Sequence, residues 1–82
     1  MRCTAVIHLR CRPTALEVAS LERMLRRVRG IDTLSVEPAE VMVTVRFDRD
    51  VTGLADIVRI IEDGGCPVIG VAQRRDGEVI AG

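Results

Sequence analysis

The chain has 82 residues, a length that allows one domain and excludes a second. Hydrophobic residues make up 48% of the chain and charged residues 29%, which is typical of a globular protein. No apolar run approaches the roughly 20 residues that a membrane span requires. The 12 basic residues balance the 12 acidic ones and only one residue is aromatic, so neither nucleic acid nor a membrane is predicted as a partner.

Apolar residues recur at every second position in some segments and at helical spacing in others, which separates predicted strands from predicted helices. Proline, glycine and clustered polar residues mark the turns between them. In chain order the pattern predicts a strand over 4–10, a helix over 14–29, a hairpin of strands over 31–36 and 41–47, a helix that starts at an N-cap, Thr52, and ends at Gly64, and a strand over 67–72. A turn at 75–77 predicts an extra C-terminal strand over 78–81.

This order of elements predicts an α+β fold of the ferredoxin-like βαββαβ type. Two helices would pack on one face of a four-stranded antiparallel sheet. No linker or low-complexity segment interrupts the pattern, so residues 1–82 are predicted to form a single domain.

The three cysteines, Cys3, Cys11 and Cys66, are an odd number without short spacing between any two. They fit neither a disulfide framework nor a zinc motif, and they indicate reduced thiols. The start of the chain shows no export signal, so a cytoplasmic location is predicted. The simplest interpretation of each cysteine is a small buried hydrophobic residue.

The start of the first predicted helix has a capping signal of its own. Thr14-Ala15-Leu16-Glu17 has the spacing of a capping box. In that motif the threonine oxygen accepts from the amide three residues on, and the glutamate reaches back to the amide of the cap. We therefore expect Thr14 and Glu17 to have a structural role.

Four segments of the sequence, taken in their order and spacing, resemble those of a known domain family. They are LERML at 21–25, GIDTLSV at 30–36, VTVRFD at 43–48, and 57–68 with IEDGGCPV at its end. Together they resemble heavy-metal-associated domains, the family of small copper chaperones and of N-terminal modules of metal-pumping ATPases, over residues 4–69. In that family a GMxCxxC loop joins the first strand to the first helix, and its two thiolates bind Cu(I), Zn(II) or another soft ion. Counting back from Leu21, the two ligand positions fall on Thr14 and Glu17, so the CxxC motif is degenerate.

A displaced thiol site is the second hypothesis for the same end of the domain. The first and fourth strands of this fold are antiparallel neighbours, which predicts that Cys11 and Cys66 lie at one end of the sheet. Two thiols suit Cu(I), while two thiols with Glu17 or an exogenous ligand suit Zn(II). Packing or a reversible disulfide explains the pair equally well. Cys3 lies eight residues from Cys11 along the strand, about 26 Å at ~3.3 Å per residue, and cannot share a site with it.

The sequence has no nucleophile with a base, no Gly-rich phosphate loop and no catalytic carboxylate pair, so no enzymatic activity is predicted. Its only histidine, His8, is predicted on the sheet face away from the helices. The leading hypothesis, by resemblance, is a small metal-binding or metal-chaperone-like protein with Cys11 and Cys66 as ligands of Cu(I) or Zn(II), and with a metal transporter or a second copy as partner.

Two alternatives stay open. One is a module that binds no metal and acts through protein interaction or regulation, for which an arginine cluster (Arg23, Arg26, Arg27 and Arg29) is the candidate docking surface. The other is a small-ligand-binding regulatory domain, with which residues 50–68 are compatible.

Overall fold

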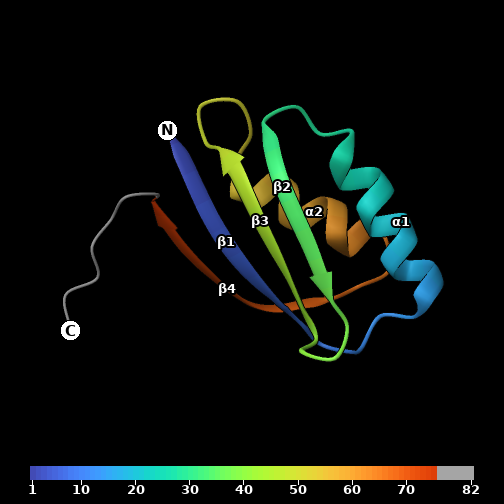
Figure 1. The fold of residues 1–82 in the computed structure, drawn as a ribbon. Coiled ribbons are helices and arrows are strands. Elements are labelled where there is room, and N and C mark those ends of the chain that lie inside the picture. The colour runs from blue at the N-terminus through green and yellow to red at the C-terminus, as the bar shows by residue number, and fades with distance from the viewer. Residues whose placement is uncertain (76–82) are drawn as a thin grey trace, which may run out of the picture.

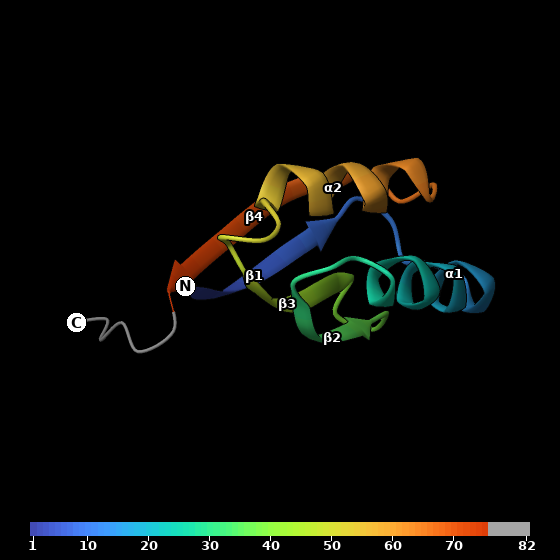
Figure 2. The same ribbon diagram turned by 90° about the horizontal axis from the view of Figure 1, so that it is seen from above.

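The computed structural model describes residues 1–75. Its elements are β1 (Arg2–Leu9), α1 (Ala15–Arg26), β2 (Ile31–Glu37), β3 (Met42–Asp48), α2 (Leu54–Asp63) and β4 (Val68–Arg75). The strands form one antiparallel sheet in the order β2-β3-β1-β4, and both helices lie on the same side of it (Figures 1 and 2). The predicted βαββαβ fold is confirmed, whereas the predicted strand over 78–81 lies outside the described residues.

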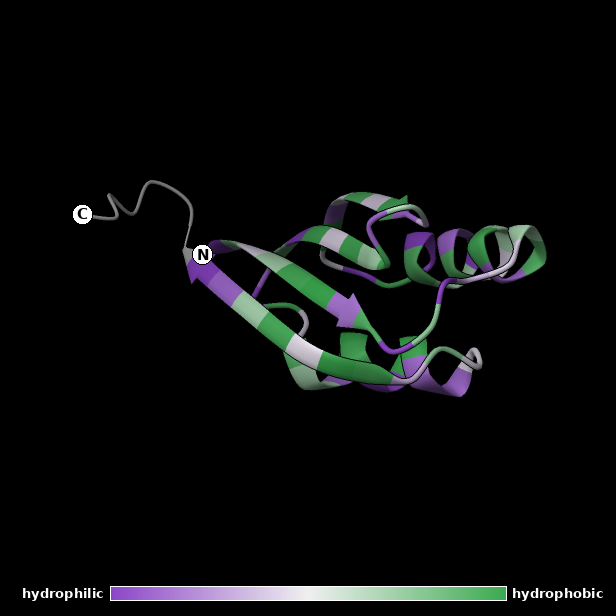
Figure 3. Ribbon diagram, turned by 90° about the horizontal axis from the view of Figure 1, so that it is seen from below, coloured by the Kyte–Doolittle hydropathy of each residue, from purple (hydrophilic) through white to green (hydrophobic). Residues whose placement is uncertain are grey.

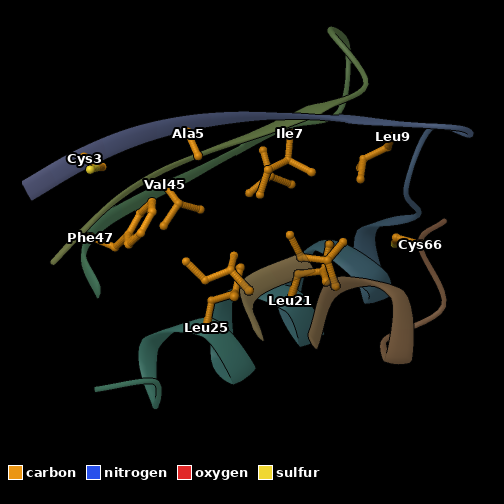
Figure 4. Packing of buried hydrophobic residues seen from close by; sticks show 12 residues of the cluster. Cys3, Ala5, Ile7, Leu9, Leu21, Leu25, Val45, Phe47 and Cys66 are labelled. Carbon is orange, nitrogen blue, oxygen red and sulfur yellow. The ribbon is translucent and has the colours of Figure 1, made fainter. Parts of the chain in front are cut away.

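The core lies between the sheet and the two helices, and β1, β3 and both helices contribute alternate or helically spaced apolar side chains to it (Figure 4). Burial of a large apolar side chain contributes about 1.5–3 kcal/mol, which is why this pattern selects the fold. The buried cluster consists of Cys3, Ala5, Ile7, Leu9, Leu21, Leu25, Val43, Val45, Phe47, Ile57, Ile61 and Cys66.

The first helix ends earlier than predicted. Arg27 is its C-cap, and residues 27–30 turn the chain into β2. Gly30 has a φ of +98°, a left-handed conformation that glycine adopts without penalty. A Cβ at this position would also stand 2.9 Å from Val51, so the turn needs glycine for two reasons. Because the chain must turn here, the helical pattern does not continue to residue 29.

The prediction of Thr52 as the N-cap of the second helix is wrong. The N-cap is Gly53, which makes no side-chain capping bond. Thr52 belongs to the preceding turn instead, because its amide donates to the Asp48 carbonyl at 3.0 Å. Thr52 is only 8% exposed, and its methyl group would lie 3.2 Å from a Cβ at Gly30, so the side chain packs against the turn between α1 and β2.

β4 begins at Val68 and continues to Arg75, three residues beyond the predicted end. The strand pairs with β1 along nearly its whole length, from Leu9↔Val68 to Cys3↔Arg75, and this pairing holds the polar residues after Ala72 in extended conformation.

Within the described residues, neither helix is long and apolar enough to cross a membrane.

Candidate metal site

Two loops meet at one end of the sheet. Residues 10–14 join β1 to α1, and residues 64–67 join α2 to β4. Figure 3 shows β1 and β4 side by side and in opposite directions. The Arg10 amide donates to the Pro67 carbonyl at 2.8 Å, next to the Leu9↔Val68 pair. Cys11 follows Arg10 and Cys66 precedes Pro67, so each loop carries a thiol next to this bond, at the same end of the sheet.

The first loop ends in the capping box that the sequence predicts. The Glu17 amide donates to the Thr14 hydroxyl at 3.1 Å, and the Thr14 amide donates to the Glu17 carboxylate at 2.8 Å. Both bonds satisfy amides that a helix start leaves without intrahelical partners. Thr14 and Glu17 therefore serve the helix, and the prediction of their structural role is confirmed.

The second loop lies close to the first helix because it is built on two glycines. A Cβ at Gly64 would stand 2.7 Å from the Met24 side chain, so glycine lets the end of α2 approach α1. Gly65 has a φ of +95° and turns the chain toward β4. A Cβ there would lie 3.6 Å from a Glu17 carboxylate oxygen, which places this acid beside the loop that carries Cys66.

The two thiols differ in environment. Cys11 is exposed, whereas Cys66 is only 4% exposed and lies at the Leu9 end of the core (Figure 4). Burial raises the pKa of the Cys66 thiol above its ordinary value of 9.0, and the negative charges of Glu17 and Cys11 raise it further. At neutral pH Cys66 is therefore a neutral thiol, which has to lose its proton before it can bind a metal ion.

The pair supplies two sulfur donors. Among residues 1–75, no group of three or more His, Cys, Asp and Glu side chains is placed to hold a metal ion. Two thiolates are a donor set that suits Cu(I), while Zn(II) takes four ligands and would require two more. The chemistry of the residues present therefore fits Cu(I) better than Zn(II).

The other candidate residues lie outside these two loops. Cys3 is fully buried near the opposite end of the core, as a small hydrophobic residue is (Figure 4). His8 is exposed on the outer sheet face, as predicted. The four arginines of the cluster are all exposed, and the Arg26 guanidinium lies 3.6 Å from the Glu22 carboxylate one turn earlier.

Several solved structures have the same architecture. A copper-binding domain of HMA7, a P-type ATPase, is 27% identical with a TM-score of 0.72, over 87% of this chain and 97% of that domain. A candidate copper-ion-binding protein from Bacillus anthracis str. Ames is 28% identical with a TM-score of 0.78, over 84% of this chain and 97% of that protein. The chain has the heavy-metal-associated fold.

A third example is the CopZ metallochaperone, with 18% identity and a TM-score of 0.75, over 80% of this chain and 98% of CopZ. The heavy-metal-associated fold is thus shared at an identity of 18%. Comparison with protein-family models and with curated proteins gave no match. The resemblance that the sequence suggests is therefore confirmed at the level of the fold.

Proposed function

We propose that this protein binds Cu(I) through Cys11 and Cys66 and handles it as a small metallochaperone-like domain. The observation that carries the proposal is the hydrogen bond from the Arg10 amide to the Pro67 carbonyl, next to which Cys11 and Cys66 lie on the two neighbouring loops. The copper-binding proteins with the same fold support it. No enzymatic activity and a cytoplasmic location remain predictions.

The two thiols would have different roles in metal handling. Cys11 is exposed and can meet an incoming ion or a donor protein first. Cys66 is buried and protonated, and completes the pair when it releases its proton to solvent. Transfer to a metal transporter, or to a second copy of this chain, would begin again at the exposed Cys11. The capping box keeps the loop folded throughout, since it requires no ion.

The test is a titration of the fully reduced protein with Cu(I) against a competing chelator of known affinity. We expect one ion per chain with submicromolar affinity, lost in the Cys11→Ser, Cys66→Ser double variant. The matched control is Cys3→Ala, which removes a thiol from the other end of the core and should retain binding. Equal affinity in the native chain and the double variant would overturn the proposal. A parallel titration with Zn(II) shows which ion is preferred.

A metal-free interaction module is the second candidate function. It is favoured by the same capping box, which closes the first loop without any ion, and by the burial of Cys66. Its surface would be the exposed arginine cluster on and after α1. A native chain that binds neither Cu(I) nor Zn(II) in the titration, and that captures an acidic partner lost on Arg23→Glu, would favour this function.

A further inference from the structure

The face of the sheet opposite the helices carries a row of three metal-ligating side chains. This open face lies toward the viewer in Figure 1, with α2 behind the strands. Glu37 of β2 pairs with Met42 of β3, Met42 pairs with His8 of β1, and His8 pairs with Gly70 of β4. These four residues therefore form one continuous row across the whole sheet.

The three side chains of the row point to the same side. Residues directly opposite one another on paired strands share a face, and successive residues alternate. His8 is exposed between the buried Ile7 and Leu9, and Met42 precedes the buried Val43. An imidazole nitrogen, a thioether sulfur and a carboxylate oxygen thus project from neighbouring strands, which lie about 4.8 Å apart.

The Glu37 carboxylate has a buried oxygen atom whose hydrogen-bonding capacity is unsatisfied. Its Oε2 is buried and has no hydrogen-bond partner among the described residues. A buried oxygen without a partner is rare, and an ion is one of the ways to satisfy it. At the other end of the row, a Cβ built on Gly70 would find no atom within 4 Å, so space beside His8 is open.

We propose that His8, Met42 and Glu37 form a second metal site, for a divalent transition-metal ion with Cu(II) bound most tightly. Nitrogen and oxygen donors bind first-row divalent ions most strongly at Cu(II), and a thioether can serve as its weak additional ligand. The ion would lie over Met42, with His8 and Glu37 leaning toward it from either side. The site uses neither loop thiol, since Cys11 and Cys66 lie beyond the paired ends of β1 and β4.

The test uses the Cys11→Ser, Cys66→Ser variant, so that Cu(II) meets neither of these thiols. Titration against glycine as a competitor gives the affinity. Paramagnetic broadening of amide NMR signals gives the position, and the chain has only one histidine to assign. We expect one Cu(II) per chain, with broadening centred on His8, Met42 and Gly70. If this variant binds no Cu(II), the second site is ruled out. The proposal for the two loop thiols is not affected, since both thiols have been removed from the variant.

Single variants decide whether the row acts as a site. We expect His8→Asn to abolish the localised broadening, Glu37→Gln to weaken binding at least tenfold, and Met42→Leu to weaken it about threefold. The matched control is Glu40→Gln, an exposed acid in the same hairpin turn, which should leave binding unchanged. Two results would overturn the proposal: unchanged affinity in both Glu37→Gln and Met42→Leu, which means adventitious binding to His8 alone, or broadening centred on the Met1 amine.

Discussion

At the scale of single residues, the thiol of Cys66 is controlled by its surroundings. Burial is the largest cause of its raised pKa, followed by the charges of Glu17 and Cys11. Glu17→Gln removes one of these charges and keeps a carbonyl oxygen that can accept from the Thr14 amide. We therefore expect the variant to lower the pKa of Cys66 while burial still keeps it above 9.0. The measurement is the alkylation rate of Cys66 against pH, followed by peptide mass spectrometry.

The protein with Glu17 and the Glu17→Gln variant should both carry Cys11→Ser in the alkylation experiment, so that Cys66 is the one loop thiol that reacts. Glu40→Gln, at an exposed acid in the turn between β2 and β3, controls for the loss of a charge. Since metal binding displaces the Cys66 proton, Cu(I) affinity should rise with pH in the native chain and rise from a lower pH in Glu17→Gln. Identical pH profiles with and without Glu17 would show that burial alone sets the reactivity of this thiol.

At the scale of the element, α1 depends on its N-cap. Thr14→Ala removes the hydroxyl that accepts from the Glu17 amide, and we expect the free energy of unfolding to fall by about 1 kcal/mol. Thr14→Ser keeps an acceptor at the same place and should restore most of the loss. Urea unfolding, with and without a chelator, makes the measurement. An effect that appears only when metal is present would contradict a cap that works without an ion.

The turn between α1 and β2 offers a second test at this scale. Gly30→Ala would place a Cβ 2.9 Å from Val51 and force a non-glycine residue to a φ of +98°. We expect a loss of about 1–3 kcal/mol, the range for a strained backbone position. Gly70→Ala is the control, because no atom lies within 4 Å of its added Cβ. Equal urea midpoints for the two variants would refute the argument that this turn requires glycine.

At the scale of the whole molecule, the sequence predicts those features of the fold that depend on hydrophobic periodicity or on local capping chemistry. Alternation in 4–10 and 41–47 predicts the buried faces of β1 and β3, and the spacing of Thr14 and Glu17 predicts the cap. The prediction of Thr52 as an N-cap is wrong because its side chain packs against a turn that is distant in the sequence. A local sequence pattern cannot reveal that contact. The row of His8, Met42 and Glu37 depends on the register of three strands, and the sequence alone does not specify it.

An ion pair between the Met1 amine and Asp48 lies at one end of the pairing of the two central strands, β1 and β3, and makes stability depend on pH. In a chain that begins at Met1 with a free amine, hydrogen bonds to Asp50 and then Asp48 raise the pKa of that amine above its ordinary 8.0. The Asp50 amide and then the Met1 amine lower the pKa of Asp48 below 3.8. The stabilisation from the amine is complete below pH 8.0 and is lost as pH rises through its folded-state pKa. The stabilisation from Asp48 is present above pH 3.8 and is lost as pH falls through its lowered pKa.

Asp48→Asn should therefore reduce stability at pH 7 and flatten the acid side of the stability curve, while acetylation of the Met1 amine should flatten the alkaline side. Urea midpoints from pH 2 to pH 10 would show both effects, with Asp63→Asn at the exposed end of α2 as the control. The Met1 amine is exposed and Asp48 is partly exposed, so salt should weaken the effects. Because Met1 directly precedes β1 and Asp48 is the last residue of β3, this ion pair joins the first residue to a strand residue 47 positions away. Curves that keep both slopes in the variants would show that the ion pair does not stabilise the pairing of these strands.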